Sequence, residues 1–252
     1  MRHNRPLHLR LILFLGLGCS LASLVYGLWI LYGSRAQIQA ADPPQSPTTT
    51  VYVALYPGFH ASLLLPIATG YREYAYGEWG FYAHSQETLW GGLKALLWPT
   101  PATLGRRTLG GPSPADPSLE IGHLKRRMGV ETLLPIQVDR ALALDLNQRL
   151  DRFFDPTFPK IYNPSYRLEF VRHPRPYHLW HNCNHFIAEQ LRQLGVAVQG
   201  DPIGGNFVLS VPNGTLSPSP APAQAIPGIG CHTSPCLRVW RQRVQGKVAQ
   251  WQ

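Results

Sequence analysis

An uncharged, mostly apolar run near the N-terminus constrains the fold of this chain more than any other feature. Residues 11–33 read LILFLGLGCSLASLVYGLWILYG and contain no charged side chain over 23 residues. As a helix they would extend about 34 Å, which is enough to cross the hydrocarbon core of a bilayer. The run therefore predicts a transmembrane helix, or an uncleaved signal anchor, ahead of a separate folded domain.

The basic residues around this run predict its orientation. Three arginines precede it, whereas only Arg35 follows it closely. The positive-inside rule then makes residues 1–10 a basic cytoplasmic tail of a single-pass membrane protein. The remaining chain would lie outside the cytoplasm, in the periplasm or at the outer membrane face. A signal peptide cleaved within residues 36–41, or a lipoprotein signal ending at Cys19, would give the same location.

The overall composition excludes several classes of protein. The chain has 252 residues, of which 44% are hydrophobic, so it can bury one sizeable core. Its 23 basic and 14 acidic residues give a net charge of +9, but only 15% of residues are charged. No dense Lys/Arg stripe is present, and we therefore expect no nucleic-acid partner. Four cysteines are too few for a disulfide-built scaffold.

Proline and charge patterns predict the domain boundaries. Residues 34–50 are polar and contain prolines, so they read as a linker. Residues 51–211 form the predicted domain. Residues 212–230 have five prolines and no charge, which is typical of a second linker. Residues 231–252 form a basic C-terminal tail, in which Cys231 and Cys236 could close a small disulfide loop in an oxidising compartment.

Hydrophobic periodicity predicts an α+β domain with an antiparallel sheet and packed helices. β-rich runs predict strands, and apolar residues at helical spacing predict helices. Proline- and glycine-rich stretches predict surface loops over 98–118 and 155–180. The expected strands cover 51–56, 59–65, 71–76, 133–138 and parts of 196–211, and the expected helices cover 87–97, 139–153 and 183–195.

A cysteine at the start of a helix is the most informative chemical feature. The stretch from Tyr177 to Val196 reads YHLWHNCNHFIAEQLRQLGV. Asn182 can cap this helix, which places Cys183 at its first position, and Gly195 can end it. The partial positive charge of a helix N-terminus favours the thiolate, which is the nucleophilic form of cysteine. Cys183 is therefore a candidate nucleophile, and an inert buried thiol is the structural alternative.

The segment from Asn182 to Phe186, NCNHF, resembles the Asn-Cys-x-His-Phe signature of lecithin:retinol acyltransferase and its relatives. Those proteins have a circularly permuted papain-like fold, in which a catalytic histidine on a strand comes first, a polar residue follows on the next strand, and the cysteine helix comes last. Here His60, Glu73 and Cys183 occur in that order. The relatives have a histidine where this chain has Glu73.

A longer stretch resembles an uncharacterised bacterial family of membrane-anchored domains of unknown function. The shared pattern is a strand, a turn and a histidine at residues 57–60, an aromatic Gly-Glu-Trp-Gly-Phe-Tyr motif at residues 76–82, and the pair Cys183-Asn184. The match spans about residues 51–196. It implies the permuted papain-like fold, shared with cell-wall cysteine peptidases, and no established activity.

These residues take defined roles in a cysteine-dependent enzyme. Cys183 would attack a carbonyl carbon, and His60 would take the thiol proton and later protonate the leaving group. Glu73 would hold the imidazole tautomer, and Glu78, in the following turn, is the alternative orienting residue. The last three residues also have structural alternatives. His60 could be a hydrogen-bonded core histidine, Glu73 a solvent-facing strand residue, and Glu78 a turn residue.

The start of the same helix also offers groups that could stabilise an oxyanion. Backbone N–H groups there, with Asn182 or Asn184 nearby, would bind the negative charge that forms on the carbonyl oxygen. A metal site is the competing interpretation, because His178, His181, Cys183 and His185 lie within eight residues. If all lie on the helix, however, the cysteine points away from the histidine pair. We therefore expect no metal and no cofactor.

Together these patterns predict a membrane-anchored hydrolase or acyltransferase that uses a cysteine nucleophile. Its expected substrates are amide or ester bonds in cell-envelope peptides or lipids, and its expected partner is the bilayer itself. The alternative function is a non-catalytic envelope protein that binds or scaffolds with the same fold. A His/Cys metal-binding protein is the third interpretation.

Overall fold

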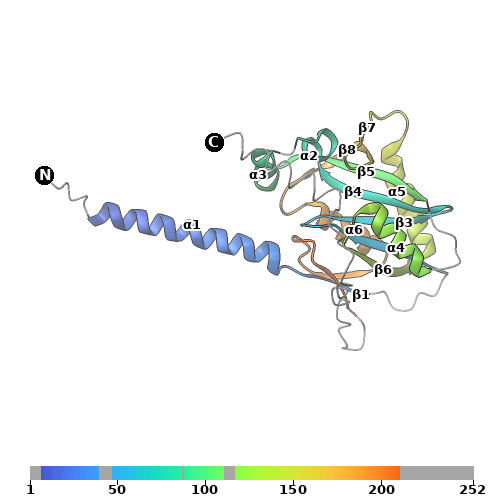
Figure 1. Cartoon of the computed structure of the whole chain (residues 1–252), viewed down its shortest axis with the longest axis horizontal. Helices are drawn as coiled ribbons and strands as arrows, with labels where there is room; N and C mark the ends of the chain where they lie inside the picture. Colours follow the sequence, from blue (N-terminus) through green and yellow to red (C-terminus); the bar gives the residue numbers. More distant parts are fainter. Residues whose placement is uncertain (1–6, 40–46, 87, 111–116, 211–252) are drawn as a thin grey trace, which may run out of the picture.

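The computed structural model describes residues 7–39, 47–86, 88–110 and 117–210. Figure 1 shows helix α1 (Leu7–Gly33) extending away from a body of sheets and packed helices. The body contains a seven-stranded sheet and a three-stranded sheet. Cys231 and Cys236 lie outside the described residues, and so does the predicted tail that contains them.

The seven-stranded sheet is antiparallel throughout, in the order β6-β2-β3-β4-β5-β8-β7. Its first three strands along the chain are joined by short turns, as the alternating turn and β-rich runs predict. The strands are β2 (Thr48–Leu55), β3 (Ala61–Ile67), β4 (Gly70–Glu78), β5 (Thr100–Gly110), β6 (Thr132–Asp139), β7 (Ile161–Asn163) and β8 (Leu168–Tyr177).

Strands β5 and β8 lie where the sequence predicts loops, and that prediction is wrong. Glycine weakens a strand unless something needs its space. At Gly105 a side chain would collide with the ring of Phe170 on the neighbouring strand, so this glycine serves the pairing of β5 with β8. The prolines of β8 are tolerated because the pairing register shifts between Thr100 and Ala102, opposite them.

The three-stranded sheet has the order β10-β1-β9. Strand β1 (Ala36–Gln39) pairs in parallel with β10 (Phe207–Ser210) and antiparallel with β9 (Ala197–Gly200). Both β9 and β10 fall within the β-rich pieces of residues 196–211. Strand β1, in contrast, lies inside the segment predicted as a linker, and its buried residues Ala36 and Ile38 join the main core.

Helices cover both faces of the seven-stranded sheet. The buried aliphatic and aromatic residues of α5 (Arg140–Asp151) and α6 (Cys183–Gln193) belong to the main hydrophobic core. A second core, on the alternate residues of β2 and β3, contains Leu124 and Met128 of α4 (Pro117–Met128). The shorter helices are α2 (Trp79–His84), α3 (Leu89–Leu97) and the 3-10 turn η1 (Arg152–Phe154).

Local sequence signals explain the two long helices of the body. Asp139 caps α5 by accepting hydrogen bonds from the amides of Ala141 (2.6 Å) and Leu142 (3.3 Å). Such a cap stabilises a helix by about 1 kcal/mol. After α6, Gly195 has a φ of 75°, the left-handed conformation that glycine adopts easily. Both helices begin and end close to where the sequence predicts.

The predicted membrane span is contradicted. Within the described part of the chain, no helix is both long and apolar enough to cross a membrane. Residues 7–33 do form a helix, which extends away from the body of the protein (Figure 1). The predictions of a transmembrane helix, and of a single-pass protein with its domain outside the cytoplasm, are therefore corrected.

The predicted fold class is corrected with it. The described chain is a mixed α/β structure with a seven-stranded antiparallel sheet and a smaller mixed sheet. It does not have the predicted architecture of a membrane-spanning helix followed by a circularly permuted papain-like domain, and a papain-like arrangement is not shown. The smaller sheet joins residues 36–39 to residues 197–210, a long-range pairing that no local pattern signals.

Candidate functional site

Cys183 is the first residue of α6, directly after the cap that the sequence predicts. The side-chain oxygen of Asn182 accepts hydrogen bonds from the amides of Asn184 (3.0 Å) and His185 (3.2 Å). These bonds satisfy two of the free N–H groups that every helix leaves at its start. The Cys183 side chain turns toward the sheet and is 4% exposed.

The backbone of the β2–β3 turn encloses the Cys183 sulfur. The thiol donates to the carbonyl oxygen of Phe59 at 3.7 Å, and the backbone amide of Ala61 also contacts the sulfur. Burial raises the pKa of the Cys183 thiol to about 11, and the nearby backbone amides offset part of that rise. The thiol is therefore neutral in this arrangement, because burial outweighs the helix terminus.

His60 lies in the same turn, between Phe59 and Ala61. Its Nδ1 is 3.1 Å from the hydroxyl oxygen of Tyr82. The imidazole lies between two tyrosine rings, with centroids 5.2 Å from Tyr82 and 5.4 Å from Tyr56. Burial lowers the pKa of His60 to about 4, although the negative charge of Glu73 acts in the opposite direction. The imidazole is therefore neutral near pH 7.

The structure thus brings the segments of the predicted nucleophile and base together through the backbone. The residues on either side of His60 both contact the Cys183 sulfur. The imidazole itself bonds to Tyr82, and no hydrogen bond joins it to the thiol among the described contacts. Proximity is established for the two segments, while the two reactive side chains have different partners.

Glu73 does not orient His60. This carboxylate is fully buried and forms an ion pair with Arg107, its direct neighbour on β5. It also accepts hydrogen bonds from Tyr56 and, at 2.7 Å, from Ser62. Glu73 influences the imidazole through its charge and through the ring of Tyr56. The alternative considered from the sequence, a strand residue that faces solvent, does not hold for Glu73 either, because its side chain is buried.

Glu78 is the N-cap of α2. Its carboxylate accepts a hydrogen bond from the amide of Phe81 at 2.6 Å, which is the turn role that the sequence also allowed. Helix α2 then places Tyr82 against His60. The residue that contacts Nδ1 of His60 is therefore Tyr82, and neither predicted carboxylate does so.

Tyr82 is the residue of the site that sequence reasoning missed, although a signal was present. It ends the Gly-Glu-Trp-Gly-Phe-Tyr motif, whose first glycine, Gly77, lies under its ring. A side chain at Gly77 would collide with that ring, so the glycine is required for the close approach. In the motif, Gly77 makes room for the tyrosine, Glu78 caps the helix that carries it, and the tyrosine contacts His60.

Asn182 and Asn184 hold neighbouring loops together. The amide nitrogens of both side chains donate to the carbonyl oxygen of Ile203, at 3.0 and 3.2 Å. Asn184 also donates to Phe59 at 2.8 Å. These contacts tie the turn that contains His60 to the loop before β10. The two predicted oxyanion donors therefore position the segments around the site.

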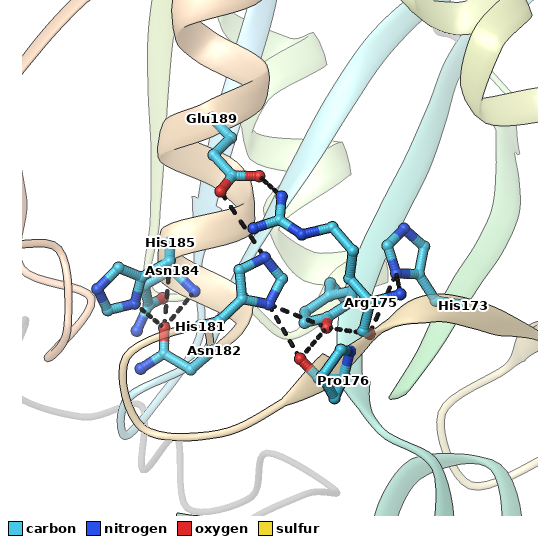
Figure 2. A network of polar contacts seen from close by, with 9 residues as sticks. His173, Arg175, Pro176, His181, Asn182, Asn184, His185 and Glu189 are labelled. Atoms are coloured by element: carbon cyan, nitrogen blue, oxygen red, sulfur yellow. Dashed lines mark hydrogen bonds and ion pairs between the residues drawn. The ribbon is translucent and has the colours of Figure 1, made fainter. Parts of the chain in front are cut away.

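The histidines near Cys183 do not converge on one point. Figure 2 shows Nδ1 of His181 beside the carbonyl of Pro176, while its ring faces Glu189 on α6, with Nε2 3.7 Å from the carboxylate. His185 instead turns to the Asn182 side chain, at 2.9 Å. Within the residues that are described, no group of three or more His, Cys, Asp or Glu could hold a metal ion.

A pocket of about 300 Å³ opens beside His60. One wall is the end of β2 and the following turn, with Tyr56, Gly58 and His60. The opposite wall is the start of β10, and two charged residues, Arg35 and Glu131, complete the lining. Cys183 is not among the residues that line this pocket.

No family model, no curated protein and no solved structure matches the chain.

Proposed function

We propose that this chain is a cysteine-dependent hydrolase or acyltransferase, with Cys183 as the nucleophile and His60 as the general base. The observation that carries the proposal is that the Cys183 sulfur contacts the backbone of Phe59 and Ala61, the two neighbours of His60. Covalent catalysis needs a base within hydrogen-bond reach of the nucleophile, and these backbone contacts hold the segment of His60 next to Cys183.

The protonation states support a mechanism with a neutral pair. Burial raises the pKa of Cys183 and lowers the pKa of His60, so the thiol keeps its proton at rest. When Nδ1–H of His60 donates a hydrogen bond to the Tyr82 hydroxyl oxygen, Nε2 is unprotonated and can take the thiol proton as the sulfur bonds to the carbonyl carbon. The imidazolium then gives that proton to the leaving alcohol or amine, and water or a second nucleophile removes the acyl group from sulfur.

Access to the sulfur requires a movement of the β2–β3 turn, because Phe59 covers it. The turn contains Gly58, whose φ of 96° is a conformation that glycine adopts without strain. Substrates are amides or esters of peptides or lipids, since a thiol nucleophile suits acyl transfer from both.

A test uses the full-length chain and p-nitrophenyl acetate, an activated ester that reports acyl transfer without a natural substrate. We expect nitrophenol release and acetylation of Cys183, detected by mass spectrometry of its peptide. His60→Ala should slow this acylation by about 10²–10⁴-fold, the usual contribution of a general base. The rate should be level near neutral pH and fall as the pH drops toward about 4, where His60 becomes protonated.

His84→Ala is the matched control, because His84 is an exposed histidine at the end of α2. It should acylate as the unmodified chain does. Acylation that is absent, or that proceeds equally in His60→Ala, would overturn the enzymatic proposal. The second candidate function, a non-catalytic binding protein, would then stand, and the 4% exposure of a neutral Cys183 favours it.

A further inference from the structure

The pocket beside His60 contains two opposite charges that do not neutralise each other. Arg35 and Glu131 both line it, and both side chains are exposed. Among the ion pairs of the described residues, none joins Arg35 to Glu131 or involves either of them. The pocket therefore offers one cationic and one anionic group to a ligand.

The backbone holds Arg35 firmly at the β10 side of this pocket. The carbonyl of Ser34 accepts a hydrogen bond from the Asn206 side chain at 2.9 Å, and the amide of Ala36 donates to the Asn206 carbonyl at 3.0 Å. Arg35 lies between these two anchored residues. The backbone of Arg35 is consequently fixed, while the side chain that carries the guanidinium is exposed.

Glu131 is anchored in the same way on the other side. Its amide donates to the carbonyl of Leu55 at 2.9 Å, at the end of β2 and next to Tyr56. Thr132, which follows it, pairs with Leu55 at the start of β6. The two charges thus come from distant parts of the sequence and are held by separate sheets.

We propose that this pocket binds a short zwitterionic peptide, with its carboxylate at Arg35 and its ammonium group at Glu131. The inference deepens the proposed function, on which its catalytic meaning rests, by naming the substrate class. A guanidinium is well suited to a carboxylate, with which it can form two hydrogen bonds. A ligand with both charges would satisfy both side chains at once.

The size and lining of the pocket favour a peptide over a lipid. Its volume of about 300 Å³ lies at the lower end of small-molecule sites, which span about 300–1,000 Å³. An acyl chain would need a continuous apolar wall, whereas the apolar residues of this pocket share its lining with charged and polar groups. The apolar residues are Leu55, Phe207 and Val208, and the others include Arg35, Glu131, His60 and Tyr56. The charged groups suit the two charged ends of a peptide with one or two peptide bonds, and the polar groups suit its amide.

The pocket is also connected to the candidate nucleophile. Asn184, the neighbour of Cys183, donates to Phe59 in the His60 turn. The same Asn184 side chain packs against Gly205 on the opposite wall, where a larger residue would press on it at 3.1 Å. A ligand that moves either wall therefore acts on the start of α6 and on the covered sulfur.

The test is isothermal titration calorimetry of the full-length Cys183→Ala chain, which binds without turnover. The probes are Ala-Ala, N-acetyl-Ala-Ala, which lacks the ammonium group, and Ala-Ala-amide, which lacks the carboxylate. We expect Ala-Ala to bind at least tenfold more tightly than either derivative. Arg35→Gln should abolish the preference over the amide, and Glu131→Gln should abolish the preference over the acetylated peptide. Arg140→Gln, at an exposed arginine outside the pocket, should change neither.

Each outcome is decisive and is separable from the enzymatic proposal. Absence of Ala-Ala binding at millimolar concentration, equal binding of all three probes, or binding that both pocket variants leave unchanged would overturn the inference. Binding with the expected preferences, together with no acylation of Cys183, would retain the ligand site and reject the enzyme. Acylation that depends on His60, with no Ala-Ala binding, would do the reverse.

Discussion

Two clusters of buried polar groups lie close together in this protein and differ in their charge. One cluster is an ion pair, and the other consists of neutral groups. Glu73 and Arg107 are neighbours on β4 and β5 and form an ion pair. Cys183 at the start of α6 and His60 in the β2–β3 turn are, in contrast, both neutral at pH 7. Tyr56 links the two clusters, because its hydroxyl contacts Glu73 and its ring lies beside His60.

The difference teaches what each cluster can do. A buried charge persists only where a partner compensates for its lost hydration, and the ion pair provides that partner. A buried group without such a partner becomes neutral, and it can then move a proton when a substrate arrives. The charged cluster is consequently a structural element, and the neutral cluster is the candidate for chemistry.

Breaking the charged cluster should have the largest effect on stability. In Arg107→Met, Glu73 remains fully buried without its cation, so the free energy of unfolding should fall by about 3–5 kcal/mol. Urea unfolding at pH 7 measures this change. The control is Arg149→Met, which removes an exposed pair with Asp145 and should cost less than about 1 kcal/mol. Equal losses in the two variants would contradict the comparison.

The same two clusters show what could be predicted from the sequence. The start of α6 was predicted because its signals are local: Asn182 caps it, Cys183 follows, and Gly195 ends it. The environment of Glu73 was not predicted, because its partner Arg107 lies 34 residues away in β5. The proline and glycines of β5 are typical of a loop, so no strand was expected there. Cross-strand neighbours depend on register, which a single sequence does not contain.

The candidate site follows the same rule. The sequence predicted that the segments of Cys183 and His60 would act together, and the Cys183 thiol does contact the backbone next to His60. It assigned the orienting role to Glu73 or Glu78, whereas the structure gives the contact to Tyr82. Order along the chain indicates which segments are neighbours, but the choice among several polar side chains depends on where each strand and helix ends.

Titration should expose the neutral cluster. Burial lowers the pKa of both His60 and His173 to about 4, so the unfolded chain binds more protons than the folded chain between about pH 4 and 6.5. Their contribution to stability is complete above pH 6.5 and is lost as the pH falls toward 4, by up to roughly 3 kcal/mol for each histidine. Urea unfolding between pH 7 and 4.5 follows this loss.

Variants assign that pH dependence to the two side chains. His60→Gln and His173→Gln should each reduce the slope of stability against pH by about one proton, and His84→Gln should leave it unchanged. A slope that none of the three variants alters would mean that carboxylates alone cause the acid sensitivity, and that the two imidazoles are hydrated.

Loss of the helix cap should have a smaller effect that spreads from α6 to its neighbours. Asn182→Ala removes two cap bonds and the bond to Ile203, so we expect a loss of about 2 kcal/mol. Asn182→Ser should restore part of it, because serine also caps helices. Thr88→Ala, at the exposed cap of α3, should cost about 1 kcal/mol or less. Equal costs for the two alanine variants would show that the bond to Ile203 contributes nothing.

The smallest effect on stability should come from Tyr82→Phe, and it sharpens the comparison most. The variant keeps the ring beside His60 and removes only the hydroxyl that contacts Nδ1, so the unfolding free energy should fall by about 1 kcal/mol. If the hydroxyl fixes the imidazole tautomer, acylation of Cys183 by p-nitrophenyl acetate should slow at least several-fold. Tyr162→Phe, at an exposed tyrosine, should change neither quantity. A stability loss with unchanged acylation would mean that Tyr82 only packs against His60 and that His60 has no orienting partner. A slower reaction at nearly constant stability would make Tyr82 a positioning residue.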